Sequence, residues 1–170
     1  MKQRPLRLVE NENRFAGLEP DDLTDPEIES LTELALGMLA ARHRKGEALQ
    51  SPEQTEAYLR LWLAERKNEV FGCVYLDNKH RVISVEELFQ GTIDGASVHP
   101  RVVVQRALET NSAAALFFHN HPAGIAEPSQ ADLRITQRLR DALALVDIRV
   151  LDHVVVATEG SVSFAERGHI

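Results

Sequence analysis

The sequence contains a single cysteine, Cys73, so the chain cannot form an internal disulfide bond. It also lacks any apolar run close to the ~18 residues that a membrane-spanning helix needs. The N-terminal segment is basic but has no apolar stretch of the kind that a secretory signal carries. These absences predict a cytoplasmic protein with no membrane association and no disulfide framework.

The sequence has fewer basic than acidic residues, with 19 Lys and Arg and 26 Asp and Glu, so its net charge is −7. Autonomous DNA-binding domains usually present a basic face, since counterion release drives their binding. Any contact with DNA would therefore need a local basic patch, for which Arg134, Arg138 and Arg140 are the candidates.

Glycine and proline, at 9 and 7 residues, are too few for a collagen-like or low-complexity chain. The sequence is 44% hydrophobic and 26% charged, as in an average globular protein. Its 170 residues suffice for one domain with a short appendage.

The pattern of apolar residues divides the chain at about residue 46. In residues 1–46 the pattern predicts a loose tail, followed by a helix that starts at the capping residue Thr24. Residues 47–170 predict one domain that begins with a helix capped at Ser51. The further elements are expected as strands at 69–76 and 81–89, a helix at 100–111, a strand at 113–119, a helix at 129–146, and strands at 148–157 and 161–165. This order predicts an α/β (α+β) fold, with helices packed against a β-sheet.

His119 and His121 are two residues apart at the end of a predicted strand, so their side chains share a face. Asp132 lies one turn into the next predicted helix, and the loop between can return it to the histidines. Two imidazoles and one carboxylate make a three-ligand zinc site with an open fourth position, whereas structural zinc sites normally close all four. Zinc in such a site lowers the pKa of a bound water towards ~7. We therefore predict a Zn²⁺ site.

Each of these residues also has a structural interpretation. Ser129 and Asp132 are spaced as a capping box, in which the serine caps the helix and the aspartate bonds back to the cap amide. A single histidine is more often hydrogen-bonded or exposed than a metal ligand. The combination of all four residues favours the metal site. The letters His-Asn-His do not indicate an HNH nuclease, whose motif is spread over a longer segment.

A hydrolytic zinc site also needs a group that takes a proton from water and passes it to the leaving amine. Glu69 opens the first long predicted strand and is a candidate, although a strand-start glutamate can simply be an exposed charge. Glu86 and Glu87, on the second strand, are its rivals. Cys73 is expected to be a small buried strand residue.

The pattern His119-x-His121-x7-Ser129-x2-Asp132, with an upstream glutamate, resembles the JAMM motif of the JAB1/MPN metalloprotease superfamily. Six segments resemble the bacterial RadC family more narrowly: 76–78, 86–93, 97–101, 119–122, 146–153 and 163–168. The similarity runs from about Ser51 to the C-terminus.

This resemblance implies an MPN/JAB fold, a cytidine-deaminase-like mixed sheet flanked by helices, here with a short helical N-terminal extension. By position, it implies that His119, His121 and Asp132 bind zinc. It further implies that Glu69 is the catalytic glutamate and that Ser129 helps to stabilise an oxyanion. His99 matches a family signature, with a structural role at a helix start and a functional role both open.

Two features depart from the family pattern. The family commonly has a serine where this chain has Ala123, which removes a hydroxyl near the site. Longer RadC members carry an N-terminal helix-hairpin-helix-like region, and we expect this chain to be a short form that lacks it.

The first functional hypothesis is a zinc-dependent hydrolase that cleaves a peptide or isopeptide bond in an unidentified protein or peptide, with Glu69 as general base and then acid. The alternative is a DNA-repair or recombination accessory protein whose metal site is not catalytic. A third reading is a binding scaffold, as MPN domains without the motif are.

Overall fold

A computed structural model describes residues 19–42, 52–63, 66–91, 97–122 and 124–170. The chain forms two compact units, Met1–Ala35 and Leu36–Ile170, and the site discussed below belongs entirely to the second. The predicted boundary at residue 46, the predicted cap at Ser51 and the departure at Ala123 lie outside the described residues.

Helix α1 (Asp25–Arg42) starts where the sequence predicts. Both the backbone N–H and the hydroxyl of the preceding Thr24 donate hydrogen bonds to the carboxylate of Glu27, at 2.9 and 2.7 Å. One turn of 3-10 helix, Pro20–Asp22, lies within the segment that the sequence predicts as a tail. None of the described helices is long and apolar enough to cross a membrane.

Five strands form one mixed sheet in the order β2-β1-β3-β4-β5. They are β1 (Val70–Leu76), β2 (Val82–Gln90), β3 (Ala114–His121), β4 (Arg149–Ala157) and β5 (Gly160–Ser163). Strand β3 pairs antiparallel with β1 and parallel with β4. A parallel neighbour requires a crossover connection, and the helix between β3 and β4 provides it. The predicted fold class is therefore confirmed.

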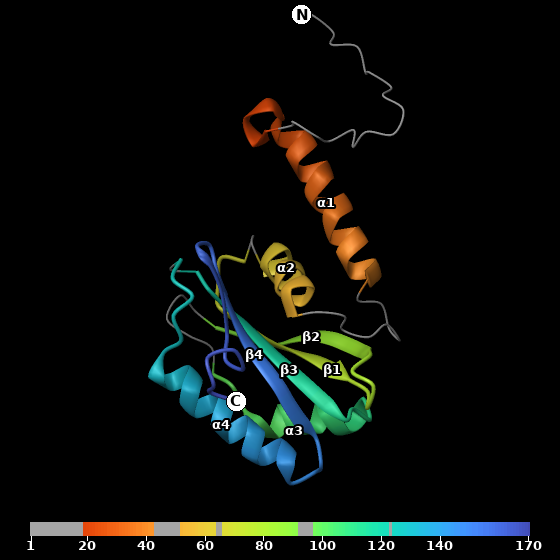
Figure 1. Cartoon of the computed structure of the whole chain (residues 1–170), viewed down its shortest axis with the longest axis vertical. Coiled ribbons are helices and arrows are strands. Elements are labelled where there is room, and N and C mark those ends of the chain that lie inside the picture. Colours follow the sequence, from red (N-terminus) through yellow and green to blue (C-terminus); the bar gives the residue numbers. More distant parts are fainter. Residues whose placement is uncertain (1–18, 43–51, 64–65, 92–96, 123) are drawn as a thin grey trace, which may run out of the picture. The chain divides into compact units, whose positions relative to one another are not determined.

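Helices cover both faces of the sheet (Figure 1). Helix α2 (Pro52–Leu63) packs on one face, where Leu59 and Leu63 are buried among strand residues. Helices α3 (Pro100–Glu109) and α4 (Gln130–Ala144) pack on the other, through residues such as Val103 and Leu139. This sandwich explains why β1 is buried along its whole length, as its unbroken apolar sequence predicts.

Alternation along β3 decides which face each of its residues serves. Leu116 and Phe118 join the core beneath α2, whereas Ala115 and Phe117 join the core beneath α3 and α4. His119 continues the second series and is 1% exposed. The C-terminal end of β3 thus directs His119 towards the α4 side of the sheet, and the residue after it points the other way.

Candidate metal centre

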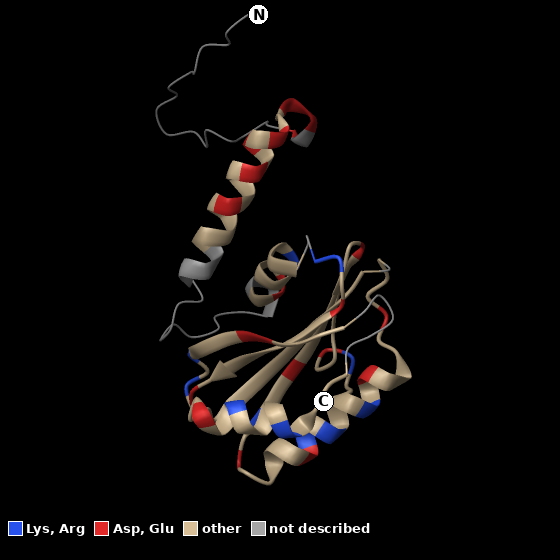
Figure 2. Ribbon diagram, turned by 180° about the vertical axis from the view of Figure 1, so that it is seen from behind, with Lys and Arg blue, Asp and Glu red and all other residues tan. Residues whose placement is uncertain are grey.

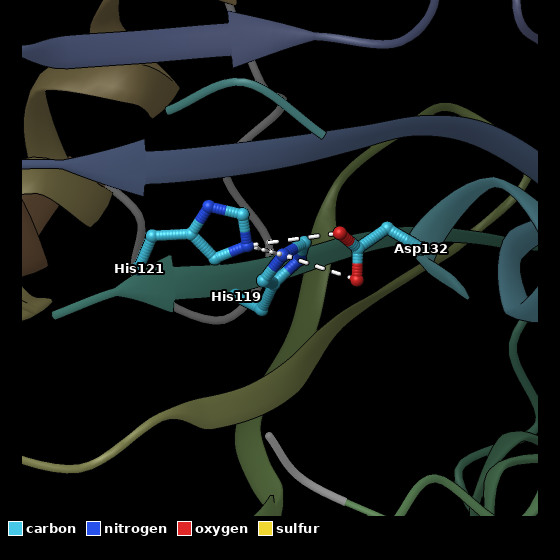
Figure 3. A group of neighbouring side chains, drawn as sticks. All are labelled: His119, His121 and Asp132. Atoms are coloured by element: carbon cyan, nitrogen blue, oxygen red, sulfur yellow. Dashed lines mark hydrogen bonds and ion pairs between the residues drawn. The ribbon is translucent and has the colours of Figure 1, made fainter. Parts of the chain in front are cut away.

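Three side chains meet where β3 ends and α4 begins (Figure 3). The Nε2 atoms of His119 and His121 lie 3.0 Å apart. Asp132 Oδ1 is 3.6 Å from Nε2 of His119, and Oδ2 is 3.7 Å from Nε2 of His121. One ligand atom from each residue can be chosen so that all lie within 4.8 Å of one another. The structure therefore brings together the three residues that the sequence predicts as metal ligands.

These separations fit a metal ion. Bonds of about 2.0–2.1 Å at tetrahedral angles place neighbouring zinc ligands roughly 3.3 Å apart. The separations of 3.0, 3.6 and 3.7 Å lie near that value, the last two running to different oxygens of Asp132, and one atom from each residue can be chosen within 4.8 Å. Two neutral imidazole nitrogens and one carboxylate oxygen are also ligand types that zinc accepts.

Ser129 holds Asp132 through the predicted capping box. The serine hydroxyl accepts the N–H of Asp132 at 3.1 Å and donates to Oδ2 of Asp132 at 2.6 Å. The backbone N–H of Ser129 also donates to Oδ2, at 2.7 Å. Because these bonds use Oδ2, the other carboxylate oxygen is left to face His119.

The protonation states of Asp132 and His119 suit metal binding. Burial raises the pKa of Asp132, but the neighbouring His121 and His119 and the bonds from Ser129 outweigh it and hold the pKa well below its usual range. Burial lowers the pKa of His119 to about 4. The carboxylate of Asp132 raises the pKa of His121. At neutral pH Asp132 is therefore ionised and His119 is neutral, which is the state a metal ligand requires.

A second buried histidine, His153 on β4, supports His119 from behind. Nδ1 of His119 lies 2.8 Å from Nε2 of His153, and Nδ1 of His153 lies 2.6 Å from the hydroxyl of Thr136. That hydroxyl donates to the backbone carbonyl of Asp132 at 2.6 Å. With Nε2 of His119 free to bind a metal, the hydrogens run in one direction: His119 donates to His153, which donates to Thr136. We call these three bonds the histidine chain.

Neither His153 nor Thr136 is predicted as a site residue from the sequence. The one signal is a histidine directly before the apolar run of β4, at the first buried position of that strand. A metal-ligating histidine usually donates its second ring N–H to an acceptor that fixes the ring. His153 supplies this acceptor.

Glu69 directly precedes β1 and is half-buried. The register of β1 and β3 pairs Phe71 with His119, so two-residue alternation directs Glu69 and His121 to the same face beyond that pair. The charge of Glu69 contributes to the raised pKa of His121, although less than Asp132 does. The predicted general base thus stands beside the ligand group.

The rival glutamates are engaged elsewhere. Both carboxylate oxygens of Glu86 accept hydrogen bonds from Arg106 of α3, at 2.7 and 2.8 Å. Glu87 is one residue further along β2 and pairs with Arg66, at 2.5 Å, on the opposite face of the sheet. The geometry therefore favours Glu69 over both.

Asn120, between the two histidines, secures the segment that carries Glu69. Its side-chain oxygen accepts the N–H of Val70 at 2.7 Å, and its amide donates to the carbonyl of Asn68 at 3.1 Å. Asn120 is 4% exposed, so these bonds are protected from water. The His-Asn-His tripeptide therefore sends its histidines to the ligand group and its asparagine to the chain on either side of Glu69.

A sequence model described as the RadC-like JAB domain matches residues 49–169, most of the chain. The chain belongs to the RadC family. The matched region contains both histidines of β3, Asp132, Ser129 and Glu69, so the candidate site lies within the RadC-like domain.

Curated RadC-family relatives share more than half of their aligned residues with this chain. The UPF0758 protein of Vibrio parahaemolyticus is 57% identical over 144 residues, which cover 85% of this chain and 64% of the relative. That of Thioalkalivibrio sulfidiphilus is 58% identical over 142 residues, 84% of this chain and 63% of the relative. The chain thus spans less than two thirds of the length of these relatives.

His99, part of the RadC-like signature, directly precedes α3 and makes no side-chain capping hydrogen bond. Its backbone carbonyl accepts the N–H of Val102, and its exposed ring stands edge-on to Phe89 of β2 with 5.9 Å between ring centres. These contacts place His99 at a helix start. A functional role for it stays a prediction.

Proposed function

We propose that this RadC-like domain is a zinc-dependent hydrolase of amide bonds, either peptide or isopeptide. The observation that carries the proposal is the group of His119, His121 and Asp132, whose ligand atoms are spaced for one ion. The matching JAB domain family supports a hydrolase-type metal site.

The number of ligands argues for catalysis over a structural role. Structural zinc sites usually have four protein ligands, and catalytic sites have three. Among the described residues, the group contains three. Zinc bound there would polarise a scissile carbonyl and make a hydroxide available near neutral pH.

Glu69 would take the proton of the attacking water and later deliver it to the leaving amine. Its half-buried position beside His121 supports this role. Ser129 would donate its hydroxyl hydrogen to the developing oxyanion. Since the hydroxyl donates this hydrogen to Asp132 Oδ2 in the structure, it would have to rotate towards the substrate.

The test combines metal content with peptide cleavage. We would purify wild type, His119→Ala, Glu69→Gln and Glu86→Gln without chelators, measure zinc by mass spectrometry, and incubate each protein with a degenerate pool of synthetic peptides. We expect about one zinc per chain in all proteins except His119→Ala. Only wild type and the matched control Glu86→Gln should cut peptides.

Two results would refute the proposal. One is a zinc-loaded wild type that cuts neither the peptide pool nor isopeptide-linked lysine peptides. The other is a Glu69→Gln variant that cuts as fast as wild type, which would remove Glu69 from the mechanism.

A further inference from the structure

A pocket of about 730 Å³ opens on the α2 side of the sheet, between α2 and the C-terminal ends of β3 and β4, and meets the candidate metal centre at His121. His121 lines it, so one residue borders both the pocket and the ligand group. Part of its wall is apolar and comes from Leu61, Pro122 and Val156. Its volume is in the range of pockets that take small ligands or a few residues of a peptide.

Within the part of the chain that the structure describes, the charged residues that line this pocket are all basic. They are Arg60, Arg66 and Lys67, and no Asp or Glu is among the lining residues that belong to the described ranges 52–63, 66–91, 97–122 and 124–170. Arg66 pairs with Glu87, whereas Arg60 and Lys67 form no ion pair with a carboxylate of the described chain. Figure 2 shows basic residues in the last turn of α2 and in the segment after it.

The basic segment is held in place by the candidate site itself. The amide of Asn120 donates to the carbonyls of Asn68 and Arg66, at 3.1 and 3.4 Å. The N–H of Arg66 donates to the carbonyl of Leu63 at 3.0 Å, which ties the segment to the end of α2. The cations therefore extend from a fixed backbone that also carries Glu69.

We propose that this pocket is the subsite for a carboxylate of a peptide substrate, placed next to the scissile amide. The inference rests on the proposed hydrolase function and specifies its substrate class: a peptide segment with an acidic residue. Arg60 and Lys67 bind the carboxylate, and the apolar wall packs against the neighbouring side chain.

The pocket fits a peptide better than nucleic acid. Tight binding to a duplex depends on many phosphate contacts along the backbone. Here three cations, one of them already paired, surround a single partly apolar hollow. One or two carboxylates on an otherwise uncharged peptide match both the charge and the wall.

The test measures binding separately from cleavage. Two decapeptides of identical sequence, one with two glutamates and one with glutamines in their place, would carry a net-neutral rhodamine label. Their affinity for the zinc-loaded Glu69→Gln chain would be followed by fluorescence anisotropy. In this background the probe persists during the measurement whether or not the wild type proves to be a hydrolase.

The decisive variants remove two charges either inside or outside the pocket. Arg60→Gln with Lys67→Gln alters the pocket, and Arg134→Gln with Arg138→Gln removes the same charge from α4. We expect the pocket variant to bind the glutamate probe about tenfold more weakly and the α4 variant to bind it like the parent. Added salt should reduce the affinity of the glutamate probe more than the affinity of the glutamine probe.

Equal affinity for the two probes, equal loss in the two double variants, or no binding of either probe would overturn the subsite. A labelled DNA duplex that displaces the glutamate probe and depends on Arg60 and Lys67 would reassign the pocket to nucleic acid. Selective binding of the glutamate probe, together with a wild type that cuts nothing, would refute the hydrolase and leave an anion-binding pocket.

Discussion

The histidine chain gives a direct prediction for metal affinity. His153 is fully buried and accepts the second ring N–H of His119, so His153→Leu leaves that hydrogen without an acceptor in an apolar setting. It also removes the group that orients the ring. Leucine is close to histidine in volume, so the change mainly deletes hydrogen bonds.

The expected loss of zinc affinity in His153→Leu can be estimated in two ways. Loss of a partner that orients a metal-binding histidine typically reduces metal affinity by about 10–100-fold. Independently, a buried polar group left unpaired costs about 1–3 kcal/mol, which corresponds to a similar factor. Thr136→Val, which is nearly isosteric, removes only the outer bonds of the chain and should cost less.

Zinc dissociation constants would be measured at neutral pH by competition with a chromophoric chelator. Val103→Ala is the matched control, because Val103 is buried on the same face of the sheet and has no polar group to offer a ligand. It should lower thermal stability and leave zinc affinity unchanged. If His153→Leu binds zinc as tightly as Val103→Ala does, the histidine chain has no part in metal binding and the reasoning is refuted.

Two further predictions concern the stability of the metal-free chain. Burial lowers the pKa of both His119 and His153, while that of His121 is raised. Below pH 6.5 the unfolded chain therefore binds more protons at His119 and His153 than the folded chain does, which outweighs the opposite effect of His121. The urea midpoint should fall as the pH drops from 7 to about 4. A constant midpoint would contradict this prediction. A methyl group at Gly72 would overlap a buried aromatic ring and a backbone carbonyl, so Gly72→Ala should lose about 1–3 kcal/mol of unfolding free energy. Gly37→Ala, with open space around it, is the control, and equal urea midpoints for the two variants would count against the packing argument.

Local patterns in the sequence identify most of the secondary structure. The apolar run at 69–76 corresponds to β1, buried on both faces, and the helix expected at 100–111 is α3. The helix expected at 129–146 is two residues shorter at its C-terminal end, at Ala144, and the last strand ends at Ser163 rather than at residue 165. Such ends depend on turn geometry more than on periodicity.

The ligand group can be predicted because its members are close in sequence and on elements with a fixed period. The histidine chain cannot, since it depends on tertiary pairing. His153 is 34 residues from His119, and only the parallel pairing of β3 with β4, which aligns Phe117 with His153, brings the rings together. No spacing rule in a single sequence encodes that register. The same holds for Asn120, whose partners lie about fifty residues earlier in the chain.

Asp132 shows why a structural and a functional interpretation of one motif can both hold. The sequence presents the capping box and the metal ligand as alternatives, yet a carboxylate has two oxygens. Oδ2 receives the hydrogen bonds of Ser129, and Oδ1 faces Nε2 of His119 at 3.6 Å. The capping bonds fix the carboxylate at the start of α4, and the histidine chain ties the carbonyl of the same residue to the back of His119. Helix capping therefore supplies the rigidity that a ligand on a loop-to-helix junction would otherwise lack. The capping box of Ser129 and Asp132 thus positions the carboxylate for the ligand group.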